Sequence, residues 1–278
     1  MILIDTSRMV IAAALNEAGY SPKNSSEENS NLIKHIFFNM LRIYNKTYSR
    51  KYGQLVFAID SRNYWRKEIF PYYKEHRKKK REDSVVDWEL VFKIKDELVS
   101  DLIQYFPYHV MEIDGAEADD IIAVLSRTTG YPHLIIATDH DVYQLLSENV
   151  HQYDPKKKEF VKLVKPVDEF LREHIVGGDS GDGIPNIKSV SNSFVDKIRQ
   201  KPISKPFLKD CVENGVPEEF LDRYYENEKL IDLNMIPENI VSDIISKWKN
   251  KPTKDGSKVF NYLARNKYRL LLQDIGDF

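Results

Sequence analysis

The residues that could carry out chemistry concentrate in one stretch of the chain, Asp114–Leu146. Its sequence, DGAEADDIIAVLSRTTGYPHLIIATDHDVYQLL, predicts a helix, a turn, a short buried strand and a loop. Five of its acidic residues are candidate site residues: Glu117, Asp119, Asp120, Asp139 and Asp141. In a right-handed parallel α/β unit, the start of the helix and the end of the next strand lie on the same rim of the sheet. Carboxylates this close repel one another, and bound cations would relieve the repulsion.

Two earlier predicted strands also end in an aspartate. Asp5 follows the apolar run Met1–Ile4, and Asp60 follows Gln54–Ile59. Either aspartate could simply cap the next helix. Ligands of open α/β sheets bind outside the carboxyl ends of the strands, so we favour one shared site. Asp114 is expected to form a turn or cap outside that site.

A glycine-rich loop, GGDSGDGIP at Gly177–Pro185, holds two more aspartates. Asp179 and Asp182 could belong only to a turn. If the loop folds back to the same rim, they add two further ligands. The spacing does not match a calcium-binding EF-hand, and the loop lacks the lysine of a phosphate-binding loop.

The predicted ligands are all carboxylates, with no histidine or cysteine among them. His140 is expected to point to solvent, and the single cysteine, Cys211, excludes an internal disulfide and a cysteine-based metal site. Oxygen ligands select Mg²⁺, with Mn²⁺ as a substitute. Two such ions about 3.5–4 Å apart can promote phosphodiester hydrolysis, so the residues predict a metal-dependent nuclease.

A basic stretch, Arg62–Arg81, precedes the acidic one. It interleaves aromatic and cationic side chains, including Tyr64, Trp65, Arg66, Tyr72, Tyr73, Lys74, Arg77, Lys78 and Lys79. Cations attract phosphates and aromatic rings stack on unpaired bases. Alternatively, the stretch is a solvated helix face with a few core aromatics. Next to an acidic rim, the pattern favours a polyanionic substrate brought to metal ions.

The remaining elements predict an α/β core followed by a helical region. Its 278 residues are 42% hydrophobic and 30% charged, with a net charge of −2. No membrane span or signal peptide is predicted, so we expect a soluble cytoplasmic protein that is not secreted. Further predicted elements are helices at 32–48, 87–106 and 166–176, a strand at 108–113, a hairpin at 150–164, and helices at 194–198, 218–230, 237–249 and 260–272. A loop is expected at Pro202–Pro206. The end of the chain is expected to leave Phe278 exposed, as a frayed terminus or a docking peptide.

The chain resembles the 5′-nuclease superfamily, which includes flap endonucleases and the 5′-exonuclease domain of bacterial DNA polymerase I. The resemblance rests on ILID, FAID, YYKEHRKKKRED, EADD, ATDHDVYQLL and GDSGDGIP, in the family's order. YWRKEIFPYYK and YYENEKLIDLNMIPENI are similar to its T-even phage ribonuclease H branch. The likeness covers nearly the whole chain.

This resemblance implies a mostly parallel sheet flanked by helices, with a helical arch at about 62–106 over the active site. It implies a nuclease core at 1–182 and a helical duplex-binding subdomain at 183–278. The implied first-metal ligands are Asp5, Asp60, Glu117, Asp120 and Asp139. The implied second-metal ligands are Asp141, Asp179 and Asp182, with Asp120 near both; Asp119 has the least defined role.

The resemblance also implies nucleic-acid contacts. Lys74 and Arg77 match basic residues that contact the scissile phosphate, and Tyr73 matches an aromatic that stacks on a base. Arg66, Lys78, Lys79 and Lys188 are expected to bind nucleic acid. After Pro185 the sequence NIKSVSNSF lacks the glycines of the family's helix–hairpin–helix. Duplex binding by Lys188 is still expected, but the resemblance no longer implies the potassium ion that relatives often bind there.

These features together predict a monomeric, phage-encoded replication nuclease. It would use two Mg²⁺ ions to remove RNA primers and adjacent DNA in the 5′-to-3′ direction, and to cut flaps. Its substrates would be DNA and RNA–DNA duplexes with 5′ ends, and a single-strand-binding protein and a sliding clamp are plausible partners. Two alternatives stay open: a PIN-type endoribonuclease and a catalytically inactive junction-binding factor.

Overall fold

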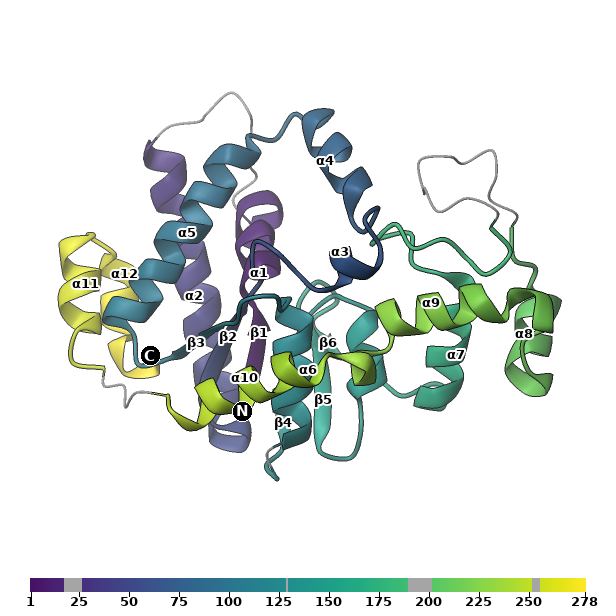
Figure 1. Ribbon diagram of the computed structural model, residues 1–278. Helices are drawn as coiled ribbons and strands as arrows, with labels where there is room; N and C mark the ends of the chain where they lie inside the picture. Colours follow the sequence, from purple (N-terminus) through teal and green to yellow (C-terminus); the bar gives the residue numbers. More distant parts are fainter. Residues whose placement is uncertain (18–26, 129, 190–201, 252–255) are drawn as a thin grey trace.

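A six-stranded sheet forms the centre of the molecule (Figure 1). The computed structural model describes residues 1–17, 27–128, 130–189, 202–251 and 256–278. The strands are β1 (Ile2–Asp5), β2 (Leu55–Ile59), β3 (His109–Glu112), β4 (His133–Ile136), β5 (Val150–Asp154) and β6 (Glu159–Phe160). Their order is β3-β2-β1-β4-β5-β6, and only β6 runs antiparallel to its neighbour. The predicted α/β class with a mostly parallel sheet is confirmed.

Helices cover both faces of this sheet because its central strands are apolar on both sides. In β1, Ile2 and Ile4 face one core and Leu3 faces the other, as the two-residue period of a strand requires. The first core includes α1 (Thr6–Ala12), α2 (Glu27–Tyr52) and α5 (Trp88–Tyr105). The second includes α6 (Ala118–Thr128) and α10 (Glu238–Lys249).

The strand order places β1 at the point where the chain reverses direction across the sheet. From β1 the chain builds outward through β2 and β3, and it then returns to add β4 and β5 on the other side. In doubly wound sheets the gap at this reversal is where ligands bind. The carboxyl ends of β1 and β4, which flank the gap, lead directly into Asp5 and Asp139.

The segment between β2 and α5 rises above the rim of the sheet (Figure 1). It contains α3 (Arg66–Ile69) and α4 (Glu75–Glu82). Helix α5 begins after Asp87, whose carboxylate accepts a hydrogen bond from the Leu90 amide at 2.9 Å. Its apolar stripe, Val91 to Leu102, is buried in the first core. Within the expected arch, it is therefore the part around α4, a helix that buries none of its residues, that stands clear of the sheet.

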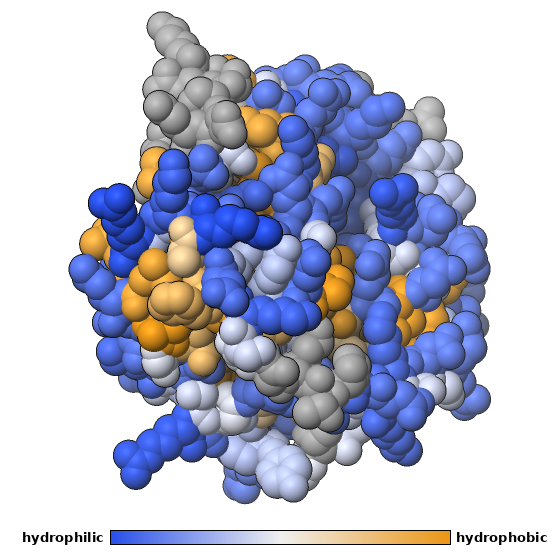
Figure 2. Space-filling model, turned by 90° about the vertical axis from the view of Figure 1, so that its left-hand side faces the viewer, coloured by the Kyte–Doolittle hydropathy of each residue, from blue (hydrophilic) through white to orange (hydrophobic). Residues whose placement is uncertain are grey.

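The C-terminal region spreads along the molecule and shares the cores of the sheet (Figure 1). Helices α7 (Val167–Gly177), α8 (Lys205–Asn214) and α9 (Leu221–Ile231) lie at one end. Helices α11 (Val259–Arg265) and α12 (Arg269–Gln273) pack on the first core at the other end. That end is largely hydrophilic with apolar patches (Figure 2). No helix among the described residues is both long and apolar enough to cross a membrane.

Three expectations for this region need correction. The single helix expected at 260–272 is broken, because Lys267 takes a left-handed φ of 60° between α11 and α12. The region expected to be only a loop, Pro202–Pro206, runs into α8, which Ser204 caps through the Phe207 amide. Phe278 is not exposed: its ring lies 5.9 Å from that of Phe106 and packs against the first core. The helix expected at 194–198 lies outside the described residues.

Candidate metal centre

Three acids at strand ends lie near Asp119, which is in the first turn of α6. We call these four residues the first cluster: Asp5, Asp60, Asp119 and Asp139. Asp5 ends β1 and caps α1 by accepting a hydrogen bond from the Arg8 amide at 3.0 Å. Asp60 follows β2 and accepts one from the Ala118 amide at 2.9 Å, which ties it to the start of α6. From the sequence, Asp5 could either cap a helix or belong to a shared site. In the structure it does both, because it caps α1 and lies in the first cluster.

Burial and mutual repulsion raise the pKa of two carboxyl groups in the first cluster. Burial and the nearby Asp60 carboxylate raise the pKa of Asp5 to about 7. Burial and Asp139 likewise raise the pKa of Asp119 well above its ordinary value. The cluster therefore holds more negative charge than its surroundings neutralise.

One arginine partly offsets this charge. The Arg8 guanidinium lies 3.2 Å from Asp5 and also contacts Asp139. Sequence reasoning missed Arg8, although its place one helical turn after Asp5 brings the two side chains onto the same face of α1. Its side chain is 40% exposed, so it can move away from the carboxylates.

A second cluster combines two aspartates with a histidine: Asp141, His174 and Asp179. One donor atom of each lies within 4.8 Å of the others, a spacing that could hold a metal ion. Asp141 follows β4, His174 comes from the last turn of α7, and Asp179 comes from the glycine-rich loop. No histidine was expected in the site, but α7 carries one there. His140 is exposed, as expected.

The loop 177–185 turns back because Gly178 permits a conformation that other residues resist. Its φ is 68°, and an added Cβ would lie 2.5 Å from the carbonyl oxygen of Ile184. The backbones of Asp179 and Ile184 then pair through hydrogen bonds of 2.9 and 2.7 Å. Burial and the nearby Asp141 raise the pKa of Asp179 to about 6.

Two of the acids expected to bind metal, Glu117 and Asp120, take part in a buried ion-pair network. Arg66 is 3% exposed, and its guanidinium donates to Glu117 at 2.8 Å and to both oxygens of Asp120. Asp120 is fully buried and also accepts from Trp65 Nε1 at 3.1 Å. Arg66 was expected to bind nucleic acid, but it folds inward with Trp65 to neutralise these carboxylates. In this arrangement Asp120 has no open side toward a metal.

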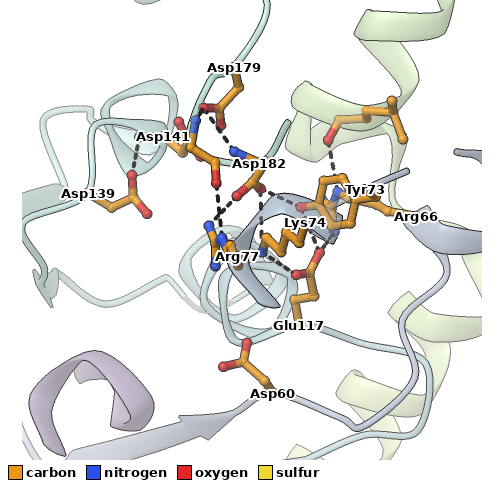
Figure 3. Close-up of polar contacts among 12 residues, drawn as sticks. Asp60, Arg66, Tyr73, Lys74, Arg77, Glu117, Asp139, Asp141, Asp179 and Asp182 are labelled. Atoms are coloured by element: carbon orange, nitrogen blue, oxygen red, sulfur yellow. Dashed lines mark hydrogen bonds and ion pairs between the residues drawn. The ribbon is translucent and has the colours of Figure 1, made fainter. Parts of the chain in front are cut away.

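The residues before α4 connect this network to the glycine-rich loop (Figure 3). The Tyr73 hydroxyl lies 2.5 Å from Asp182 and 3.1 Å from Glu117. Tyr73 is 3% exposed, so its ring is not placed to stack on a base as expected. Lys74 Nζ lies 2.5 Å from Glu117 and 3.4 Å from Asp182. Arg77 also contacts Asp182 and stays partly exposed.

Lys74 is held in an uncommon backbone conformation at this point. Its φ of 59° is left-handed, and its amide donates to the carbonyl oxygen of Asp182 at 2.8 Å. Such conformations persist where surrounding contacts enforce them, and they cluster at functional sites. Burial alone would raise the pKa of Asp182, but Lys74 and Arg77 hold it below its ordinary value.

The other expected nucleic-acid contacts lie away from this network. Lys78 and Lys79 are exposed on α4. Lys188 places its ammonium 3.3 Å from the centre of the Phe207 ring, a cation–π contact that keeps it on the α8 side of the molecule. A small cleft lies where the ion-pair network meets the second cluster. Its lining includes Arg66, Tyr73, Glu117, Asp119, Asp141, Asp179 and Asp182.

Both clusters offer donor atoms of the kinds that divalent cations take, and the second cluster also has the spacing for one ion. The first cluster supplies carboxylate oxygens only, and the second supplies two carboxylates and an imidazole. Burial, and then the neighbouring carboxylates, raise the pKa of Asp5 and Asp119 in the first cluster and of Asp179 in the second. A bound cation of charge +2 at either place would favour the ionised acids.

Comparison with known proteins identifies related sequences. Residues 1–171 match the family model described as the 5′-3′ exonuclease N-terminal resolvase-like domain, and residues 167–278 match the model of the T4 RNase H C-terminal region. Ribonuclease H of Enterobacteria phage T4 is 30% identical, with 99% of this chain and 95% of that protein aligned. The flap endonuclease Xni of Shewanella baltica is 27% identical over 54% of this chain and 58% of that protein.

The fold has solved counterparts as well. The bacteriophage T5 D15 flap endonuclease, in a complex with DNA and metal ions, superimposes with a TM-score of 0.62 at 16% identity. The match covers 88% of this chain and 96% of that chain. The helix-flanked sheet and the C-terminal helices described above are therefore the fold of this structural group.

Proposed function

We propose a reaction and a mechanism from the premise that this chain belongs to the 5′-3′ exonuclease family and is a hydrolytic 5′-nuclease with exonuclease and flap endonuclease relatives. The proposed reaction is the removal of RNA primers and adjacent DNA from the 5′ ends of lagging-strand fragments, together with cutting of 5′ flaps. It would take place on replicating phage DNA in the host cytoplasm. One observation carries the proposal: acids from three parallel strand ends gather at one rim of the sheet, and two cations, Lys74 and Arg77, contact Asp182 of the glycine-rich loop beside it.

Two divalent cations, Mg²⁺ or Mn²⁺, are proposed as cofactors. The first cluster would hold one and the second cluster the other. When bound, such ions stabilise charge on a reacting phosphate and lower the pKa of a water molecule. All the residues of both clusters come from one chain, which is consistent with an active monomer.

Lys74 and Arg77 would hold the scissile phosphate by charge. Burial alone would lower the pKa of Lys74, but Asp182 and Glu117 outweigh it and hold the pKa above its ordinary value. Lys74 therefore stays protonated and would act on the phosphate through its charge. Its ammonium lies at the rim with both clusters, where a fixed positive charge stabilises a phosphorane-like transition state.

The nucleic acid would pass between the α3–α4 segment and the rim. Lys78 and Lys79 on α4 would contact the single-stranded 5′ end, and Lys188 would contact the duplex behind it. Each phosphate neutralised by a lysine releases counterions, so binding should weaken steeply with added salt. A flap-binding titration that is flat between low and moderate salt would argue against this path.

Cleavage of a 5′-labelled RNA–DNA flap on a nicked duplex tests the proposal. The proteins compared are the wild type, Asp139→Asn in the first cluster, and Asp168→Asn, an exposed acid of α7, as control. Short 5′ products are expected from the wild type and the control in Mg²⁺, and none in chelator or from Asp139→Asn. Tight binding of the flap without cleavage in any divalent metal would instead support a junction-binding factor. Equal cleavage by Asp139→Asn would mean that the reaction takes place elsewhere.

A further inference from the structure

The second cluster differs from the first because it contains an imidazole. We propose that His174 is a direct ligand of the cation held by Asp141 and Asp179, and that this ligand makes the second site prefer Mn²⁺ to Mg²⁺. The inference rests on the proposed use of divalent cations. It concerns which metal this chain selects and which of its own atoms makes the selection.

The distances within the cluster match those between ligands of one ion. Ligands about 2.1 Å from an octahedral cation lie about 3 Å apart when adjacent and about 4.2 Å apart when opposite. His174 Nε2 lies 3.2 Å from Asp141 Oδ1 and 4.0 Å from Asp179 Oδ2. Both distances fall within that range, so one ion could contact all three atoms after small side-chain adjustments.

The imidazole is held in place by a stack of rings. The His174 ring lies 5.7 Å from that of Phe170 with an angle of 13° between the planes, and Phe170 lies 4.6 Å from Tyr143. The Tyr143 hydroxyl donates to the Lys165 carbonyl at 3.0 Å and accepts from the Val164 amide at 2.8 Å. A ligand whose ring is fixed by its neighbours loses little freedom when a metal binds.

The ring nitrogen that faces the cluster is buried beside both carboxylates. His174 Nε2 is shielded from solvent, and among the described residues it makes no hydrogen bond of normal geometry. Its contact with Asp141 is an ion-pair contact, which puts the nitrogen beside the carboxylate oxygens that would share the cation. A divalent cation placed between the two carboxylates would displace the proton that this ion pair requires and take the nitrogen as a ligand.

The ligand chemistry sets the metal preference. Mg²⁺ strongly favours oxygen ligands, whereas Mn²⁺ and later transition metals accept imidazole nitrogen more readily. Asp182, which the family resemblance implied for this metal, is engaged by Tyr73, Lys74 and Arg77. The second site is thus a mixed nitrogen and oxygen site, while the first cluster is all oxygen and suits Mg²⁺.

Electron spin-echo spectroscopy of bound Mn²⁺ tests the assignment directly, because a coordinated imidazole nitrogen modulates the echo. The proteins compared are the wild type, His174→Gln, and His140→Gln as a matched control, since His140 is an exposed histidine close to the same cluster. Nitrogen modulation is expected in the wild type and the control and not in His174→Gln. Calorimetry should show at least a tenfold weaker Mn²⁺ affinity at one site of His174→Gln, with a smaller change for Mg²⁺.

Labelling gives an answer even if His174→Gln folds poorly. Wild-type and His140→Gln proteins made with ¹⁵N-histidine should both replace the ¹⁴N modulation by a ¹⁵N signal. Absence of nitrogen modulation in the wild type, or its persistence in folded His174→Gln, would overturn the assignment. Equal loss of Mn²⁺ and Mg²⁺ affinity in His174→Gln would overturn the metal preference. Flap cleavage by the wild type, measured alongside, would show that the proposed function stands even where this inference fails.

Discussion

Replacing Asp5 by asparagine should stabilise the metal-free protein, and the gain should grow as the pH rises from 5 to 7.5. Asparagine caps helices as well as aspartate does, so the cap on α1 is retained. What changes is the charge. Burial and Asp60 raise the pKa of Asp5 from 3.8 to about 7, so the folded wild type binds a proton more tightly than the unfolded chain. That proton stabilises the fold at low pH, and the stabilisation is lost as the pH rises through 7.

The magnitude follows from the two pKa values. A carboxyl group that titrates at about 7 when folded and at 3.8 when unfolded loses about 2–3 kcal/mol of stabilisation between pH 5 and 7.5. For a chain of 278 residues, with an unfolding entropy of about 2.1 cal/mol/K per residue, this corresponds to about 4 °C in Tm. The asparagine side chain cannot titrate, so the Asp5→Asn variant escapes this loss.

The assay is urea unfolding in chelator at several pH values, with the difference between Asp5→Asn and the wild type as the readout. Titrating groups outside the first cluster cancel in that difference, whereas its remaining carboxylates lose the repulsion of Asp5 in the variant. Asp87→Asn is the control, because Asp87 caps α5 in the same way but is exposed. A stability difference that stays constant between pH 5 and 7.5 would refute the reasoning. Added Mg²⁺ should make the wild type more stable than Asp5→Asn, because the wild type binds the ion and the variant has lost a ligand.

Three further substitutions test other parts of the site. Lys74→Met should lower the single-turnover cleavage rate by about 10²–10³-fold with the flap still bound, since it removes a fixed charge at the reacting phosphate, whereas Lys78→Met should alter mainly binding; unchanged cleavage by Lys74→Met would contradict its role. Gly178→Ala should lower the free energy of unfolding by at least about 2 kcal/mol, because its φ is left-handed and its Cβ would meet the backbone of the loop. Gly177→Ala, with open space around its Cβ, should change stability by less than about 1 kcal/mol, and equal effects of the two substitutions would be inconsistent with this geometry. Arg66→Met should cost about 3–5 kcal/mol in urea unfolding, because two buried carboxylates lose their partner, and a near-neutral result would mean that the network contributes little to stability.

The framework of the site could be predicted from the sequence because it depends on local patterns. Short apolar runs that end in aspartate predicted β1, β2 and β4 within a residue or two of their observed ends. Parallel strands place their carboxyl ends at one rim, so the meeting of Asp5, Asp60 and Asp139 followed from topology alone.

The contacts that fill the site could not be predicted, because they join residues far apart in the chain. Nothing local distinguishes Arg66, which folds into the core, from the exposed Lys78 in the same basic stretch. His174 lies in an ordinary amphipathic helix, and only the packing of α7 against the residues after β4 brings it to Asp141. The break between α11 and α12 could not be predicted either, because it depends on the left-handed backbone of one residue, Lys267.

The central position of β1 has a consequence for how the enzyme matures during synthesis. Ile2 pairs with Leu55 on one side and with Leu134 on the other. Strand β1 is therefore synthesised first but cannot complete its pairing until β2 and β4 have been made. Ribosomes add about 5–20 residues per second, so about 9–35 s separate the synthesis of Asp5 from that of Asp179. A nascent chain that ends before Asp179 lacks part of the second cluster. We therefore expect cleavage only from chains of which most of the polypeptide has been made.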